Sequence, residues 1–228
     1  PSPLGDTPQI VMGACWHLLW SGDRELAQRW WPDIRRCLAL LDANDADGDS
    51  LEDRPNTPYP EQPDPGTFNH EMLYVQCFWH QAFDRAAAVA AWLGLQEART
   101  LSEKATSIRS SIAAKFSRPD GLAVWLDAEH CPHPHVGHEA IIAAAEGDVD
   151  ERIARLVVET ALRAPIWTAD GPLRAEPGKG VAAGNHVWAF MRWKLVQALL
   201  RLGDTDRALD LVERWAAQER ALFYQAPE

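Results

Sequence analysis

Several features are scarce in this sequence, and each absence excludes a class of protein. No stretch approaches about 18 consecutive apolar residues, so the sequence predicts no transmembrane helix. Basic residues number 22 against 33 acidic ones; the net charge of −11, with no basic stripe, opposes binding to nucleic acid or to an anionic membrane. No segment sustains the apolar–polar alternation of half-buried strands. The sequence therefore predicts an all-α protein with any strands confined to loops.

Cysteine is scarce as well. The four cysteines are far apart, and the first three lie on apolar helix faces, which predicts buried reduced thiols rather than a disulfide framework: Cys15, Cys37, Cys77 and Cys131. The chain begins Pro-Ser-Pro, with neither an initiator Met nor a signal peptide. We therefore expect a piece of a longer or processed protein that is soluble, with a cytoplasmic location slightly favoured.

A helix, a glycine turn and a second helix recur four times along the chain. The glycines are Gly22, Gly94, Gly147 and Gly203, spaced 72, 53 and 56 residues apart. A glycine just past an apolar run ends a helix, because glycine enters the left-handed region at little cost. Each repeat therefore predicts an αα-hairpin with a tight turn. Stacked hairpins of this kind place their long loops together at the opposite end.

The expected helix pairs follow the apolar periodicity: 9–20 and 23–41, 70–93 and 96–116, 138–145 and 148–162, and 187–202 with a last helix around 208–215. Pro32 is expected to kink or restart its helix. Asp148 and Glu151 resemble a capping box at the start of another helix. We expect one buried stripe in the second helix: Leu26, Trp30, Ile34, Cys37 and Leu41.

Several segments together resemble the six-hairpin (α/α)6-barrel glycosidases, among them the α-L-rhamnosidase, glucosidase and debranching-enzyme-like families. They are 21–26 (SGDREL), 31–34 (WPDI), 45–52 (DADGDSLE), 88–94 (AVAAWLG), 108–113 (IRSSIA), 187–190 (VWAF) and 198–208 (ALLRLGDTDRA). The resemblance implies one catalytic domain over residues 1–228 that holds about four of the six hairpins. Apolar helix faces at the open edge are then expected to be covered by an absent segment or an oligomeric partner.

The resemblance also implies where the catalytic carboxylates lie. In the related glycosidases the general acid is often an Asp after Thr-Tyr, and the matching position after Thr67 and Phe68 is Asn69, which is no acid. Glu71 is the replacement, unless it only stabilises the helix dipole. Glu228 matches the position of the catalytic base of inverting members, unless it is a frayed terminus.

The loop that follows the second helix is strongly acidic. Aspartates at alternate positions around a glycine can converge on a hard cation such as Ca²⁺. The spacing does not fit an EF-hand, and a solvated acidic turn whose side chains cap backbone N–H groups is the alternative. The candidate ligands are Asp45, Asp47, Asp49, Glu52 and Asp53.

The remaining candidates line the predicted loop end. Cys131, His133 and His135 could ligate zinc on a Pro-rich segment, although no second ligand cluster supports this. Tryptophan stacks on sugar rings, and core packing is the alternative for each Trp. The substrate-binding candidates are Asn69, His70, Asp127, His135, Trp167, Asn185, His186 and Trp188.

The sequence thus predicts a glycoside hydrolase that acts on a carbohydrate through paired carboxylates and requires no cofactor apart from a possible Ca²⁺. Because hairpins are missing, we expect the isolated chain to be weak or inactive. A non-catalytic carbohydrate-binding or structural part of a larger (α/α)-barrel protein is the first alternative. A sugar epimerase working through His135, His138 and His186 is the second.

Overall fold

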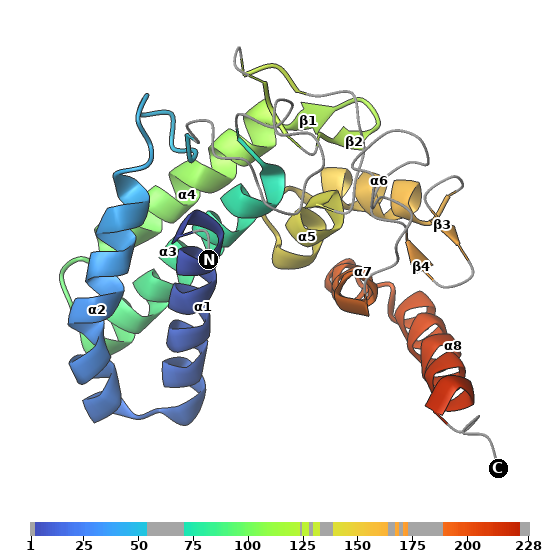
Figure 1. Ribbon diagram of the computed structural model, residues 1–228, viewed down its shortest axis with the longest axis horizontal. Helices are drawn as coiled ribbons and strands as arrows, with labels where there is room; N and C mark the ends of the chain where they lie inside the picture. Colours follow the sequence, from blue (N-terminus) through green and yellow to red (C-terminus); the bar gives the residue numbers. More distant parts are fainter. Residues whose placement is uncertain are drawn as a thin grey trace. The chain divides into compact units, whose positions relative to one another are not determined.

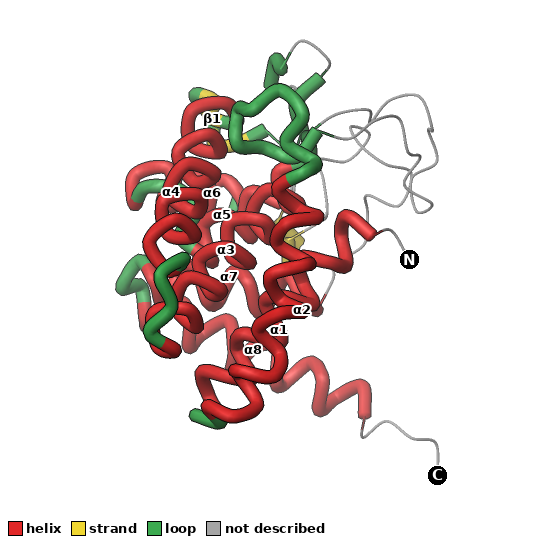
Figure 2. Tube along the Cα trace, turned by 90° about the vertical axis from the view of Figure 1, so that its left-hand side faces the viewer, coloured by secondary structure: helices red, strands yellow, loops and turns green. Residues whose placement is uncertain are grey.

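The computed structural model describes residues 3–53, 71–123, 125–127, 130–132, 139–163, 167–168, 171–172 and 189–223. These residues form eight helices and two short β-hairpins, so the all-α prediction is confirmed (Figure 2). The helices are α1 (Pro3–Ser21), α2 (Arg24–Asp42), α3 (Leu73–Leu93), α4 (Ala98–Lys115), α5 (Glu139–Glu146), α6 (Glu151–Ala161), α7 (Ala189–Arg201) and α8 (Thr205–Phe223). The strands are β1 (Ser117–Arg118), β2 (Gly121–Leu122), β3 (Trp167–Thr168) and β4 (Gly171–Pro172).

The chain divides into two compact units, and the first comprises Pro1–Ser117 and Ala123–Pro134. It holds α1 to α4, drawn from blue to green in Figure 1. Helix α3 contacts α1, α2 and α4, and most of its residues are buried, in keeping with its largely apolar sequence. Gln76 on this helix is fully buried, and its amide is satisfied by the backbone of Glu52. Helix α3 is therefore the core element of the first unit.

The second unit comprises Arg118–Leu122 and His135–Glu228. Helix α7 contacts α5, α6 and α8 there, and β3 pairs with β4 in an antiparallel hairpin. Helix α6 turns a regular apolar stripe inward, since its positions repeat at helical spacing: Ile153, Ala154, Val157, Val158 and Ala161. The prediction of a single domain over the whole chain stays a prediction.

The predicted glycine turns are confirmed at all four positions. Gly22, Gly94, Gly147 and Gly203 have φ between 66° and 80°, the left-handed region that ends a helix at little cost for glycine. Asp23 caps α2 by accepting the N–H of Leu26 at 2.8 Å. These turns join α1 to α2, α3 to α4, α5 to α6 and α7 to α8.

Three sequence predictions about the helices need correction. The cap of α6 is Asp150, whose side chain accepts the Ile153 N–H at 2.8 Å, so Asp148 is not the capping residue. Helix α2 runs through Pro32 without a restart, and the alternative expectation of a kink stays a prediction. Its buried stripe also lies partly one residue further along than expected, because Trp31 rather than Trp30 faces inward. The stripe is Ala27, Trp31, Ile34, Leu38 and Leu41.

The cysteine prediction is largely confirmed. All four thiols are free, Cys15 and Cys77 are buried, Cys37 is half-buried and Cys131 is exposed. Burial raises the pKa of Cys15 to about 12, which makes it an inert core residue. Within the described part of the chain, none of the helices has the length and apolar character needed to cross a membrane.

Candidate functional site

Glu71 lies directly before α3, at the end of the first unit opposite the glycine turns. Its backbone carbonyl accepts the N–H of Leu126 at 2.9 Å, and Met72 forms an isolated bridge with Trp125. These contacts tie the start of α3 to a segment more than 50 residues later. They also bury the Glu71 side chain, of which only 2% is exposed.

A tight turn presents His130 to this carboxyl group. Asp127 builds the turn: its Oδ1 accepts the Cys131 N–H at 2.8 Å, and its carbonyl accepts the His130 N–H at 2.9 Å. His130 adopts a left-handed conformation with φ of 58°, which is uncommon for a residue with a side chain. A hydrogen bond then joins His130 Nδ1 to Glu71 Oε1.

The environment of Glu71 shifts its ionisation strongly. Burial raises the pKa of Glu71 from 4.5 to about 7, with smaller contributions in the same direction from Asp53 and Asp47. The hydrogen bond and charge of His130 oppose this rise. The second carboxyl oxygen, Oε2, is buried and has no hydrogen-bond partner among the described residues. Glu71 therefore holds its proton up to near neutral pH, and its Oε2 has no hydrogen-bond partner among the described residues.

The acidic loop between α2 and α3 is organised by its own side chains. Asp53 accepts the N–H groups of Ala46 and Asp47, at 2.7 and 3.2 Å. Asp47 accepts the Asp49 N–H at 3.1 Å, and Asp45 accepts the Ser50 N–H at 3.1 Å. The loop thus has the capped-turn character that was the alternative to a calcium site.

One face of α4 holds this loop in place. Lys104 pairs with Asp45 at 2.8 Å and with Asp42 at 2.9 Å, and Lys115 pairs with Asp49. Ser111 Oγ donates to the Asp49 carbonyl at 2.7 Å. The contacting positions on α4 are three or four residues apart, so they share one side of the helix: Lys104, Ser107, Ser111 and Lys115.

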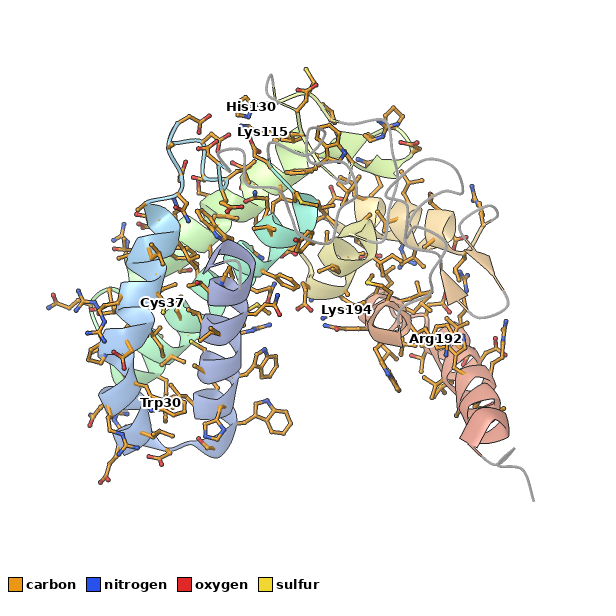
Figure 3. All side chains as sticks on the ribbon, in the orientation of Figure 1. Trp30, Cys37, Lys115, His130, Arg192 and Lys194 are labelled. Carbon is orange, nitrogen blue, oxygen red and sulfur yellow. The ribbon has the colours of Figure 1, made fainter. Side chains whose placement is uncertain are left out.

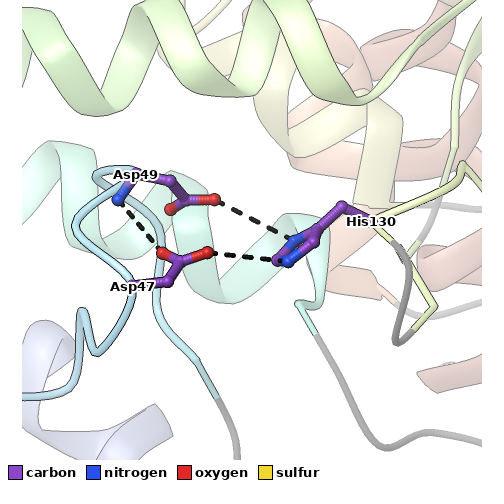
Figure 4. A group of neighbouring side chains, drawn as sticks. All are labelled: Asp47, Asp49 and His130. Carbon is purple, nitrogen blue, oxygen red and sulfur yellow. Dashed lines mark hydrogen bonds and ion pairs between the residues drawn. The ribbon is translucent and has the colours of Figure 1, made fainter.

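His130 joins the loop to Glu71. Its Nε2 lies 3.5 Å from Asp47 Oδ2, and its Nδ1 lies 4.0 Å from Asp49 Oδ2 (Figure 4). In Figure 3, His130 and Lys115 lie at the same end of the first unit, and Trp30 lies on α2 toward the other end. The imidazole therefore has carboxylates near both ring nitrogens: Glu71 and Asp49 near Nδ1, and the more exposed Asp47 near Nε2.

The structure divides the five calcium candidates. Ligand atoms of Asp45, Asp47 and Asp53 lie within 4.8 Å of one another, and Asp47 and Asp49 form a second such group with His130. Glu52 belongs to neither group; it is fully buried and its backbone pairs with Gln76. Calcium binding by this loop stays a prediction.

Most of the other candidates lie outside the described residues. They are Asn69, His70, His133, His135, His138, Asn185, His186, Trp188 and Glu228. Trp167 belongs to β3, and nothing further is described of its side chain. Asp127 shapes the turn that carries His130, and the Cys131 thiol is exposed. Among the predicted residues that the structure describes, it brings Glu71, the acidic loop and Asp127 to the same end.

Two residues of the site were not predicted from the sequence. His130 had a visible signal, since it directly precedes the zinc candidates Cys131, His133 and His135, but no spacing rule linked it to Glu71 some 59 residues earlier. The partnership of Lys115 with Asp49 also had a signal in retrospect, because polar residues recur at helical spacing along α4.

Comparisons with known proteins support the fold but give no sequence relative. No family of known sequences matches the chain, and no curated protein matches it. The GH63 mannosylglycerate hydrolase from Thermus thermophilus superposes with a TM-score of 0.76 at 14% identity, over 96% of this chain and 70% of that one. The GH78 rhamnosidase of a Bacillus species matches with a TM-score of 0.66 at 19% identity, over 91% of this chain and 21% of that one.

A rhamnosidase from Klebsiella oxytoca, with rhamnose bound, matches with a TM-score of 0.65 at 16% identity, over 93% of this chain and 37% of that one. These three structures are glycoside hydrolases of the all-α hairpin type. The chain therefore has the fold of the six-hairpin glycosidases. The (α/α)6-barrel type of fold expected from the sequence is confirmed.

Proposed function

We propose that this chain, with the fold of the six-hairpin glycosidases, is the part of a glycoside hydrolase that carries its general acid. The observation that supports this most is the Glu71 carboxyl group, buried at the loop end and with a pKa of about 7. A general acid must hold its proton at the working pH and release it to the leaving oxygen, and a pKa near that pH serves both needs.

His130 fits the second half of that role. When Glu71 gives its proton to the glycosidic oxygen, a carboxylate is left in a buried site, where an uncompensated charge is costly. The hydrogen bond between His130 Nδ1 and Glu71 Oε1 stabilises that carboxylate. Oε2, which has no partner in the described part of the chain, is the oxygen that would carry the transferred proton.

Hydrolysis also needs a second carboxylate on the opposite side of the scissile bond. We assign this role to Glu228 as the base, on its resemblance to the position of the base in inverting members. Carboxyl groups about 6.5–9.5 Å apart would then indicate inversion, and about 5–5.5 Å would indicate retention. Glu228 lies outside the described residues, so the distance is a target for measurement.

The proposed substrate is a carbohydrate. Amide and imidazole groups would bind sugar hydroxyls, and indole rings would stack on sugar faces. The residues proposed to contact the sugar are Asn69, His70, Asp127, His135, Trp167, Asn185, His186 and Trp188. The hydrolysis itself requires no cofactor, since the two carboxyl groups supply its acid and base.

A non-catalytic role is the second candidate, and exposed apolar surface favours it. On α1, the exposed fractions are 64% for Ile10, 43% for Trp16 and 81% for Trp20, with the two indole centroids 6.4 Å apart. The mannosylglycerate hydrolase match covers 70% of that protein and leaves the rest without a counterpart in this chain. We propose that further helical hairpins, from an additional segment or an oligomeric partner, cover this face in the working protein.

Leaving-group dependence tests the hydrolase proposal. The chain and its Glu71→Gln variant would be assayed on mannosylglycerate and on aryl glycosides whose phenols differ in basicity. A lost general acid slows poor leaving groups by about 100-fold or more and barely affects a dinitrophenolate, which needs no proton. Glu97→Gln, a change of the same chemistry at the other end of the helices, is the matched control.

We expect weak turnover by the isolated chain, because a cleft that lacks hairpins holds the reacting groups poorly. Turnover of poor leaving groups that survives Glu71→Gln would overturn the acid assignment. Carbohydrate binding without turnover, read from tryptophan fluorescence, would favour the non-catalytic role.

A further inference from the structure

We propose that the first unit binds a divalent transition-metal ion between Asp47, Asp49 and His130, so that the ion links two separate segments of the chain. Asp47 and Asp49 belong to the loop after α2, and His130 is held by Asp127, which accepts the N–H groups of His130 and Cys131. One ligand atom from each of these three residues lies within 4.8 Å of the others. This binding is independent of glycoside hydrolysis and does not require that proposal to hold.

The separations suit two ligands on one ion. Ligand atoms about 2.1 Å from a metal, at angles of about 90–115°, lie about 3.0–3.5 Å apart. The distance of 3.5 Å between His130 Nε2 and Asp47 Oδ2 falls in this range (Figure 4). A carboxylate oxygen of Asp49, on the other side of Gly48 from Asp47, completes the group.

Glu71 supplies an independent observation. Its side chain lies against the His130 ring with only 2% exposed, and its Oε2 has no partner in the described residues. Histidines that bind a metal through one ring nitrogen usually donate the other N–H to a carboxylate, which fixes the tautomer and the ring orientation. The hydrogen bond between Glu71 Oε1 and His130 Nδ1 places such a carboxylate there, so His130 Nε2 is left facing Asp47.

The donor set selects the class of ion. One imidazole with two carboxylates suits Zn²⁺ or Mn²⁺, whereas Ca²⁺ prefers six to eight oxygen ligands. The Cys131 thiol, one residue after His130, is not part of the group, so a thiolate zinc site is a different arrangement. The side chains of His130 and Asp47 are 40% and 44% exposed, which gives an ion a route from solvent.

Lys115 competes with a metal ion for the Asp49 carboxylate. Its ammonium group pairs with Asp49 and therefore occupies part of the charge that an ion would use. The lysine side chain is 28% exposed and long enough to turn away. Removing its charge should strengthen metal binding, and this prediction would not follow if the carboxylates only formed a surface turn.

Calorimetric titration of the EDTA-treated chain with ZnCl₂ and MnCl₂ tests the proposal. His130→Ala and Asp47→Asn should each weaken binding at least about tenfold, since both remove a ligand. Asp47→Asn keeps an oxygen that can accept the Asp49 N–H, so the turn is preserved. Lys115→Gln should tighten binding. Asp42→Asn, a carboxylate bound to Lys104 and outside the group, is the control and should change affinity less than about twofold.

Co²⁺ absorption gives a second readout, because loss of an imidazole ligand changes the visible spectrum of the bound ion. Circular dichroism of each variant without metal would show that it is folded. The proposal is overturned if the parent chain binds neither ion at micromolar concentration, or if His130→Ala binds as tightly as the parent. Ca²⁺ binding that is unaffected by His130→Ala, together with no binding of Zn²⁺ or Mn²⁺, would also overturn it and would favour the oxygen-only site of the acidic loop.

Discussion

Two glutamates of the first unit, Glu71 and Glu97, stand before consecutive helices at opposite ends of the same structure. Glu71 precedes α3 at the loop end, and Glu97 precedes α4 beside the Gly94 turn. Each is hydrogen-bonded to a ring nitrogen: Glu71 to His130 Nδ1, and Glu97 to Trp31 Nε1, which donates at 2.9 Å. Their pKa values nevertheless move in opposite directions.

Burial explains the difference. Glu71 is 2% exposed, and the loss of water raises its pKa to about 7 against the opposing pull of His130. Glu97 is 34% exposed; the Trp31 hydrogen bond is the main cause that lowers its pKa, and Arg35 adds to it at 3.7 Å. The hydrogen bond to the ring therefore decides the direction of the pKa shift only at Glu97, where water still solvates the carboxylate. At Glu71, burial outweighs it.

The hydrogen bonds around the two residues also differ. At the glycine end, the Arg24 guanidinium donates to the carbonyls of Trp92 and Leu93 at 3.1 and 2.9 Å, which satisfies the end of α3. At the loop end, a buried carboxyl oxygen of Glu71 stays without a partner in the described residues. The first arrangement stabilises the fold, whereas the second leaves a group available for chemistry.

Removing the Glu71 charge should have the largest effect on stability. The raised pKa of the folded state means that stability falls as pH rises from about 4.5 to about 7. Glu71→Gln should remove this loss and be more stable than the parent by about 3 kcal/mol at pH 8. Near pH 4 the two proteins should be equally stable. Urea unfolding at both pH values measures this; a variant that is less stable at pH 8 would contradict it.

His130→Ala should move Glu71 further in the same direction. Without the donor, burial acts unopposed, and the pKa of Glu71 should rise by about 1, as expected for a hydrogen bond to a charged group. Carbon-13 NMR titration of the metal-free variant measures the change. A lower pKa than in the parent would show that His130 does not stabilise the carboxylate.

Asp53→Asn should have a smaller effect of opposite sign. The Asp53 charge is a minor cause of the raised Glu71 pKa, so its removal should lower that pKa by less than about 1. The amide oxygen can still accept the Ala46 and Asp47 N–H groups, which keeps the loop in place. The same titration checks the sign, and an unchanged value would show that the loop does not influence Glu71.

Glu97→Gln should have the smallest effect. The lowered pKa of Glu97 contributes stability above its ordinary value, and this contribution is lost as pH falls through the folded-state pKa. Because the side chain is partly solvated, we expect a loss below about 1 kcal/mol at pH 7 and none at pH 3. Unfolding curves at both pH values test this. A loss of unfolding free energy as large as the change at Glu71 would contradict the contrast between the two glutamates.

The fold was largely predictable from this sequence, because its signals are local. Glycines at Gly22, Gly94, Gly147 and Gly203 mark the turns, and apolar spacing marks the helices. The errors were also local. Trp31 rather than Trp30 faces inward, and its indole donates to Glu97. Asp150 rather than Asp148 caps α6.

The site was only partly predictable, because its contacts are distant in sequence. Resemblance pointed to Glu71, but its burial depends on the segment around Trp125 and Leu126, and its partner His130 is 59 residues away. The φ of 58° at His130 has no signature in the sequence. Local spacing predicted the acidic loop, but not that α4 would hold it through Lys104 and Lys115.

Direct titration of Glu71 tests the central claim most simply. Carbon-13 NMR of chain labelled at glutamate Cδ, with Glu71→Gln and Glu97→Gln to assign the two signals, would follow both carboxyl groups in one experiment. We expect Glu71 to titrate at about 7 and Glu97 below its ordinary value of 4.5. A Glu71 signal that titrates near 4.5 would contradict the account, since such a group is ionised at neutral pH and has no proton to donate.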